Sequence, residues 1–155
     1  MAGRRFGQDR YKPPGEWVQT TMAEDVVDIP HHKRDALAFV HAVDLASRKG
    51  LAYGVMVVPE PSNRVDRYAI KVLGFADRRS LFGKVKRDIW HVGYLDAGVA
   101  AELHNDLIST GHPISAELYS VYLGADGDFV DITIIVLAPP GYSHSARRRS
   151  PRLSQ

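Results

Sequence analysis

Apolar residues recur at every third or fourth position in two stretches of the chain, residues 31–49 and 96–110. This spacing gathers apolar side chains on one face of a helix. Pro30 suits the first turn of the first helix, and Gly50 suits its C-terminal cap. Asp96 is of a residue type that caps helix N-termini. The pattern therefore predicts two amphipathic helices.

Five shorter apolar runs have the length and composition of β-strands. The last two flank a five-residue turn, 124–128, and predict a hairpin. The order of helix, three strands, helix and two strands favours a mainly β (α+β) fold with a small curled sheet or barrel. The predicted strands are the run that begins at residue 51 and is ended by Pro59 and Pro61, and residues 68–75, 85–95, 114–123 and 129–137.

The two ends of the chain differ from this central part. Residues 1–29 are charged, contain Pro13 and Pro14, and lack periodicity, so we expect a flexible N-terminal arm. Residues 30–140 hold all the predicted elements and form the expected folded domain. Residues 141–155 contain four arginines and few apolar side chains, which predicts a disordered Arg-rich tail. A total of 155 residues is the usual size of one domain.

Charge is distributed unevenly along the chain. The 20 Lys and Arg residues nearly balance the 18 Asp and Glu residues, for a net charge of +2. Residues 64–87, however, contain eight basic and two acidic residues, whereas residues 88–140 contain eight acidic residues and no Lys or Arg. A focused positive region attracts polyanions whatever the net charge. The alternative is a solvated surface, which is the commonest role of such a charge run.

The sequence contains no catalytic pattern. It lacks a G-x-S-x-G elbow, a P-loop, a G-x-G-x-x-G turn and an H-E-x-x-H helix. The absence of cysteine excludes disulfides, Cys-ligated zinc and thiol catalysis, and fits a cytoplasmic location. His91 and His104 could meet in space, but without a third ligand they predict no metal site. We therefore expect no enzyme activity, no cofactor, no signal peptide and no membrane span.

Two segments form a more specific pattern. Residues 58–73 read VPEPSNRVDRYAIKVL, a strand end followed by E-P-x-N-x-x-D-x-x-A-I-x-V. Residues 90–103 read WHVGYLDAGVAAEL, a G-Y-L turn that leads into an Ala-rich helix. In combination they resemble the HIRAN domain in its stand-alone bacterial form, over residues 50–110 and the final hairpin. The resemblance implies an OB-like β-barrel of five to six strands with two α-helices.

The resemblance also implies a function. Family members bind nucleic acid, so the expected partners are single-stranded DNA or DNA 3′ ends, in DNA repair or processing beside a helicase or nuclease. The end-binding loop of the family maps onto Asn63 and Asp66. A carboxylate can accept a hydrogen bond from a terminal hydroxyl, and an amide can donate to a phosphate or a base. Both residue types also form turns, and the two interpretations stay open.

The chain departs from the family pattern at the loop. Many members have Pro-Tyr between the Asn and the Asp, where this chain has Arg64 and Val65. Arg64 can stack on a base or contact a phosphate instead. Tyr94 is either a stacking partner or a core residue, and Phe129 is either a base-contacting or a buried aromatic. The predicted nucleic-acid site comprises Asn63, Arg64, Asp66, Arg67, Lys71, Tyr94 and Phe129. The alternative function is a non-catalytic protein–protein adaptor, favoured by the acidic stretch and the missing tyrosine.

Overall fold

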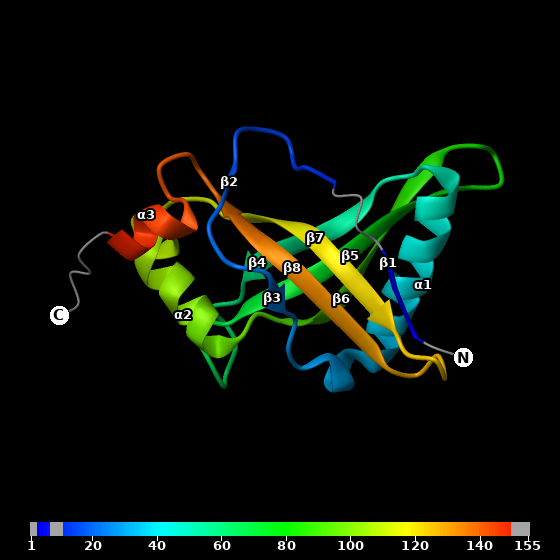
Figure 1. Cartoon of the computed structure of the whole chain (residues 1–155), viewed down its shortest axis with the longest axis horizontal. Coiled ribbons are helices and arrows are strands. Elements are labelled where there is room, and N and C mark those ends of the chain that lie inside the picture. The colour runs from blue at the N-terminus through cyan, green and yellow to red at the C-terminus, as the bar shows by residue number, and fades with distance from the viewer. Residues whose placement is uncertain (1–2, 7–10, 150–155) are drawn as a thin grey trace.

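The computed structural model describes residues 3–6 and 11–149. Its strands are β1 (Arg4–Phe6), β2 (Val18–Gln19), β3 (Glu24–Asp25), β4 (Tyr53–Pro59), β5 (Ile70–Arg79), β6 (Val85–Tyr94), β7 (Ser115–Leu123) and β8 (Val130–Ala138). They form two antiparallel sheets (Figure 1). One sheet has the order β1–β7–β8–β2, with β3 also paired to β8, and the other has the order β4–β5–β6.

Three α-helices accompany the sheets: α1 (Lys33–Lys49), α2 (Ala97–Asp106) and α3 (His144–Arg149). Two 3-10 turns, η1 (Ile29–His32) and η2 (Ile108–Thr110), precede α1 and follow α2. Gly50 ends α1 in the left-handed conformation, with a φ of 67°. The Asp96 carboxylate accepts hydrogen bonds from the backbone of Gly98 and Val99 at the start of α2. The two helices predicted from periodicity are thus confirmed, with their caps at Gly50 and Asp96. Pro30, however, lies in η1 and not in the first turn of α1, and α2 ends at Asp106, before the predicted end at residue 110.

The barrel prediction is correct only in part. The fold is α+β, with a five-stranded sheet and a second, three-stranded sheet in place of one barrel. Five of its strands are those expected from the sequence, although β5 continues to Arg79, four residues beyond the predicted end at residue 75. The other three come from the first 25 residues and contain only two or three residues each. Segments this short carry no measurable alternation, which is why the sequence pattern did not reveal them.

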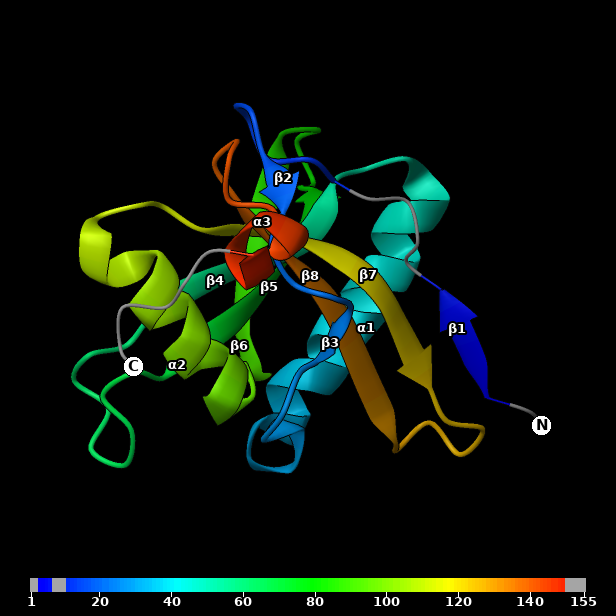
Figure 2. The ribbon, with the colours of Figure 1, turned by 60° about the vertical axis from the view of Figure 1, so that its left-hand side comes forward.

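The core lies between the two sheets and α1. Phe39 and Val43 of α1, Val72 of β5, and Leu118 and Ile132 of the larger sheet are all fully buried. The helix packs directly on β5, because a Cβ atom at Gly74 would lie 2.5 Å from the Phe39 ring. Helix α1 therefore covers one face of the β4–β5–β6 sheet, while α2 and α3 lie side by side at the other end of the molecule (Figures 1 and 2).

Both ends of the chain differ from the expected arm and tail where the structure describes them. Backbone pairing joins β1 to β7, and joins β2 and β3 to β8. In α3, the Arg147 guanidinium donates to the Thr20 hydroxyl at 2.6 Å and to carboxylates of Glu102 and Asp106 at 3.0 and 2.7 Å. The charged composition of both ends gave no sign of these contacts. Strand pairing at a sheet edge uses backbone groups, and the acidic partners of Arg147 come from a distant part of the chain. The remainder of both predictions, residues 1–2, 7–10 and 150–155, lies outside the described residues.

Candidate nucleic-acid interface

The loop between β4 and β5 takes its shape from two polar side chains. The Asn63 side-chain oxygen accepts hydrogen bonds from the backbone N–H groups of Val65 and Asp66 at 2.9 and 3.0 Å. The Asp66 carboxylate accepts one from the Tyr68 N–H at 2.9 Å through Oδ1. Asn and Asp form such local bonds in turns. The turn-forming interpretation of both residues is therefore correct, and it leaves Asp66 Oδ2 without a hydrogen bond among the described residues.

This loop borders a cavity of about 370 Å³. Three of the predicted site residues, Asn63, Asp66 and Tyr94, come together in its wall. Val27 and Tyr94 form an isolated β-bridge, which brings the segment before α1 to the opposite side. The lining consists of Val27, Asp28, His32, Asn63, Val65, Asp66, Ala69, Tyr94, Leu95 and Ala97.

Glu60 connects the loop to β6. Its Oε1 accepts a hydrogen bond from the Asn63 amide at 2.7 Å and another from the Tyr94 hydroxyl at 2.9 Å. These two bonds lower the pKa of the Glu60 carboxyl, so it remains ionised. Burial, followed by the bond to Glu60, raises the pKa of Tyr94. Glu60 was not among the predicted site residues, although the sequence signal was present as the Glu of E-P-x-N.

Histidines extend the wall beside Tyr94. The rings of His32 and His91 lie 4.1 Å apart, and His91 lies 5.0 Å from the Tyr94 ring. Burial, followed by the neighbouring His32, lowers the pKa of His91. His104, considered from the sequence as a neighbour of His91, packs instead against Tyr68 at 4.4 Å. Within residues 3–6 and 11–149, no group of three or more potential ligands could hold a metal ion.

The predicted cations are neighbours, along the chain or across the β5–β6 pair, of residues that line the cavity. Lys71 lies opposite Tyr94 in the β5–β6 register and is half-buried. Arg64 is exposed, and Arg67 donates to the Tyr68 hydroxyl at 2.6 Å while its guanidinium lies 4.8 Å from that ring centroid. None of these three described side chains lines the cavity. The Lys and Arg side chains therefore lie outside the cavity, whereas the residues that line the cavity include two acids, Asp28 and Asp66.

Phe129 lies apart from the other predicted site residues. It is 60% exposed, so it is not a buried aromatic. It lines a second cavity of about 370 Å³, together with the ion pair of Lys33 and Asp128 at 2.8 Å. Asp28 contributes to both cavities. The structure thus brings together Asn63, Asp66 and Tyr94 and separates Phe129 from them.

Comparisons with known proteins give one structural similarity. No family model matches the chain, and no curated protein matches it. The structure is similar to the crystal structure of the HIRAN domain of human HLTF, over 92% of this chain and 99% of that chain, with 16% sequence identity and a TM-score of 0.44. The similarity is to the family that the sequence pattern resembles.

Within the described part of the chain, no helix has the length and apolar character needed to cross a membrane.

Proposed function

We propose that this chain is a nucleic-acid-binding module that captures single-stranded DNA by its 3′ end. The observation that carries the proposal is the meeting of Asn63, Asp66 and Tyr94 around one cavity. These residues come from two segments that are about 30 positions apart in the sequence, and both segments belong to the HIRAN-like pattern. The cavity would receive the terminal nucleotide, and the basic residues around it would contact the phosphates that follow.

The charge of the cavity favours a terminal hydroxyl over a terminal phosphate. Asp28 and Asp66 place carboxylates in the wall, and these repel a phosphate dianion at short range. Asp66 can accept a hydrogen bond from a 3′ hydroxyl, which an internal nucleotide does not have. The half-buried ring of Tyr94 offers a surface for a base. Asn63 acts indirectly in this proposal, because its amide already binds the loop and Glu60.

In this proposal, the cations beside the cavity contact the phosphates of the strand. Lys71, Arg64 and Arg67 lie beside the cavity and outside its lining. Contacts of this kind fix the position of a strand without selecting its sequence. The proposed module therefore selects for an end and tolerates many sequences.

Fluorescence anisotropy tests this function. We expect the chain to bind an oligonucleotide with a free 3′ hydroxyl more tightly than the same oligonucleotide with a 3′ phosphate or with only its 5′ end accessible. D66N should remove the difference between the two 3′ ends, whereas the matched control D35N, at an exposed position in the first turn of α1, should retain it. No binding at low salt would refute nucleic-acid binding. Equal binding of all three oligonucleotides would refute end capture alone.

A protein-binding adaptor is the second candidate function. The exposed ring of Phe129 lies beside Asp126, Asp128 and Asp131 around the second cavity, an arrangement that suits a basic segment with an apolar anchor. A pull-down that survives nuclease treatment and charge reversal at Arg78 and Arg79, but is lost on Phe129→Ser, would favour this function over the first.

A further inference from the structure

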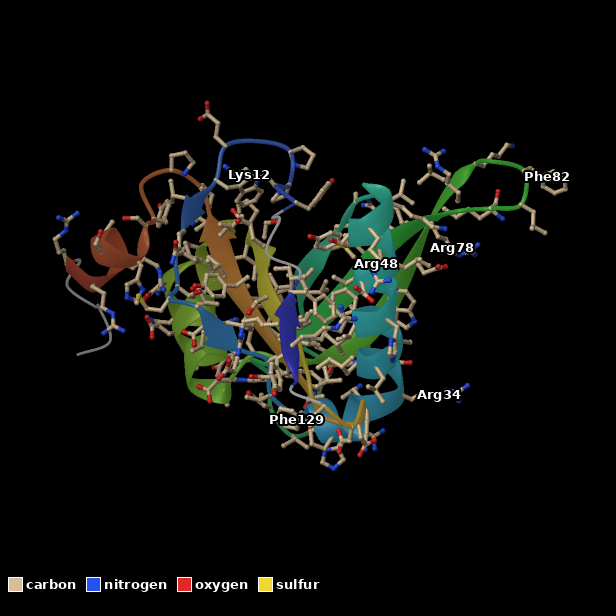
Figure 3. All side chains as sticks on the ribbon, turned by 45° about the vertical axis from the view of Figure 1, so that its right-hand side comes forward. Lys12, Arg34, Arg48, Arg78, Phe82 and Phe129 are labelled. Atoms are coloured by element: carbon tan, nitrogen blue, oxygen red, sulfur yellow. The ribbon has the colours of Figure 1, made fainter. Side chains whose placement is uncertain are left out.

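The β5–β6 hairpin ends in two apolar side chains that touch almost nothing. Leu81 is 101% exposed and Phe82 is 92% exposed. The turn that carries them is ordered by hydrogen bonds from the N–H of Ser80 to the Lys84 carbonyl at 2.7 Å and from the N–H of Gly83 to the Ser80 carbonyl at 3.0 Å. Figure 3 shows Phe82 at the far end of this hairpin, which projects beyond the body of the molecule.

The stem behind this tip is cationic. Five basic residues lie between positions 77 and 88, against Asp77 and Asp88. The two acids pair with Arg87 and Arg78, each at 2.7 Å. The other basic side chains have no acidic partner among the described residues: Arg79, Lys84 and Lys86. The tip is therefore an apolar pair with unpaired positive charges directly behind it.

A ligand for this tip must combine an apolar face with a negative rim. Exposed apolar patches rimmed by polar residues mark interaction sites. The end of a nucleic-acid duplex has this chemistry, because its last base pair presents a flat π-face and is bordered by phosphates. Apolar side chains can pack on base steps, and neighbouring cations can neutralise the phosphates.

The position of the tip relative to the cavity favours a nucleic acid over other anionic surfaces. Lys71 and Tyr94 lie at one end of the β5–β6 ribbon, beside the cavity, and the tip lies at the other end. Eight residue steps separate Lys71 from Arg79, about 26 Å at the usual rise of a strand. That length corresponds to about eight nucleotides stacked as in a duplex, and to fewer in an extended strand.

We propose that Leu81 and Phe82 pack against the terminal base pair of a duplex, while Arg79, Lys84 and Lys86 contact its phosphates. The single strand that continues from this duplex would run along the ribbon, and its 3′ end would occupy the cavity. The preferred ligand is therefore a duplex with a short 3′ overhang. This inference rests on the proposed function, because it takes the cavity as the site of the 3′ end.

The test compares a free single strand with the same strand presented as a 3′ overhang of 2 to 12 nucleotides on a duplex. We expect the overhang to bind at least about fivefold more tightly than the free strand, in line with the contribution of stacking one base. The preference should be greatest at or below about eight nucleotides and should fall for longer overhangs. A longer overhang lets the duplex end move away from the hairpin tip while the 3′ end is bound, which lowers the effective concentration of the duplex at the tip.

Variants separate the tip from the cavity. The double variant L81S/F82S should lose the preference for the overhang and bind the free strand as the wild type does. Its fold should be unaffected, since both side chains are exposed, and M22S, at a side chain that is 62% exposed elsewhere, is the matched control. Equal affinity of the wild type for both ligands, or an unchanged preference in the double variant, would overturn the inference and leave the proposed function intact.

Two further outcomes are distinct. Failure to bind any single strand would overturn the proposed function and this inference with it. Binding of vesicles rich in anionic lipid that is lost in L81S/F82S, without any preference for the overhang, would assign the tip to a membrane surface and overturn the nucleic-acid assignment.

Discussion

Two arginine-rich segments look alike in the sequence, but one arginine of each lies in an opposite environment in the structure. The β5–β6 hairpin holds Arg79 at its exposed stem, whereas α3 holds Arg147 with a side chain that is only 3% exposed. The difference lies in the partners that the fold supplies. Arg147 meets Thr20, next to β2, and two acids of α2, Glu102 and Asp106, and so it joins α3 to α2 and to the N-terminal segment. The residues that surround an arginine in space therefore decide whether it stabilises the fold or stays available to a ligand. The local sequence does not distinguish these two roles.

Removal of Arg147 should have the largest effect. R147A removes the buried cation that binds two partly buried carboxylates and the Thr20 hydroxyl, and we expect a loss of about 3–5 kcal/mol in the free energy of unfolding, measured in urea. R148A, at the exposed neighbouring position, should change stability by less than about 0.5 kcal/mol. Equal effects of the two substitutions would show that Arg147 is as solvated as the hairpin arginines.

The loop beside the cavity should show a smaller structural effect. N63A removes the acceptor for two backbone N–H groups and the donor to Glu60, and we expect a loss of about 1 kcal/mol in stability. Oligonucleotide affinity should fall with it, because the same bonds hold Asp66 at the cavity. S62A, at the exposed preceding position, serves as the control. Wild-type affinity in N63A would contradict a role of this loop in binding.

Much of the fold could be predicted from the sequence, and the exceptions have physical causes. The two long helices and the five longer strands have a clear apolar periodicity. The helix caps at Gly50 and Asp96 are of residue types that are typical of those positions. The two- and three-residue strands are held by backbone pairing and by tertiary contacts, neither of which leaves a pattern. Arg147 shows the same limit, since its acidic partners lie more than 40 positions away in the sequence.

The grouping of residues around the candidate site could be predicted to a similar extent. Asn63, Asp66 and Tyr94 could be grouped because they belong to one recognisable pattern. His32 lies in the cavity wall because the segment before α1 pairs with β6 through Val27. No local pattern in the sequence predicts this pairing. Phe129 was assigned by its position in the last hairpin, and the structure places it at a second cavity.

A lysine beside the cavity and a lysine at the end of α1 should differ in their effect on the salt dependence of binding. K71Q should lower the slope of log affinity against log salt by about 0.7 for a single strand if Lys71 contacts one phosphate. K49Q, at the exposed end of α1, should leave the slope unchanged. An unchanged slope in K71Q would remove Lys71 from the interface.

The smallest expected effect concerns pH. The pKa of His91 is lowered in the folded chain. As pH falls below about 6.5, His91 is therefore protonated in the unfolded state before it is protonated in the folded state. Stability should therefore decrease between pH 7 and pH 5, and His91 should contribute less than about 1.4 kcal/mol per pH unit to this slope. Urea titrations at several pH values should show a shallower dependence in H91Q and an unchanged one in H41Q, whose side chain is exposed. A slope that is the same in H91Q would mean that burial of His91 does not govern it.

Titration with a short oligonucleotide that has a free 3′ hydroxyl, followed by NMR, tests the central claim most directly. The account predicts that the backbone amides of residues 63–68 and of Tyr94 shift as the oligonucleotide is added, and that a 3′ phosphate on the same oligonucleotide weakens these shifts. Shifts that avoid this loop, and appear instead around Phe129 or along α3, would contradict it.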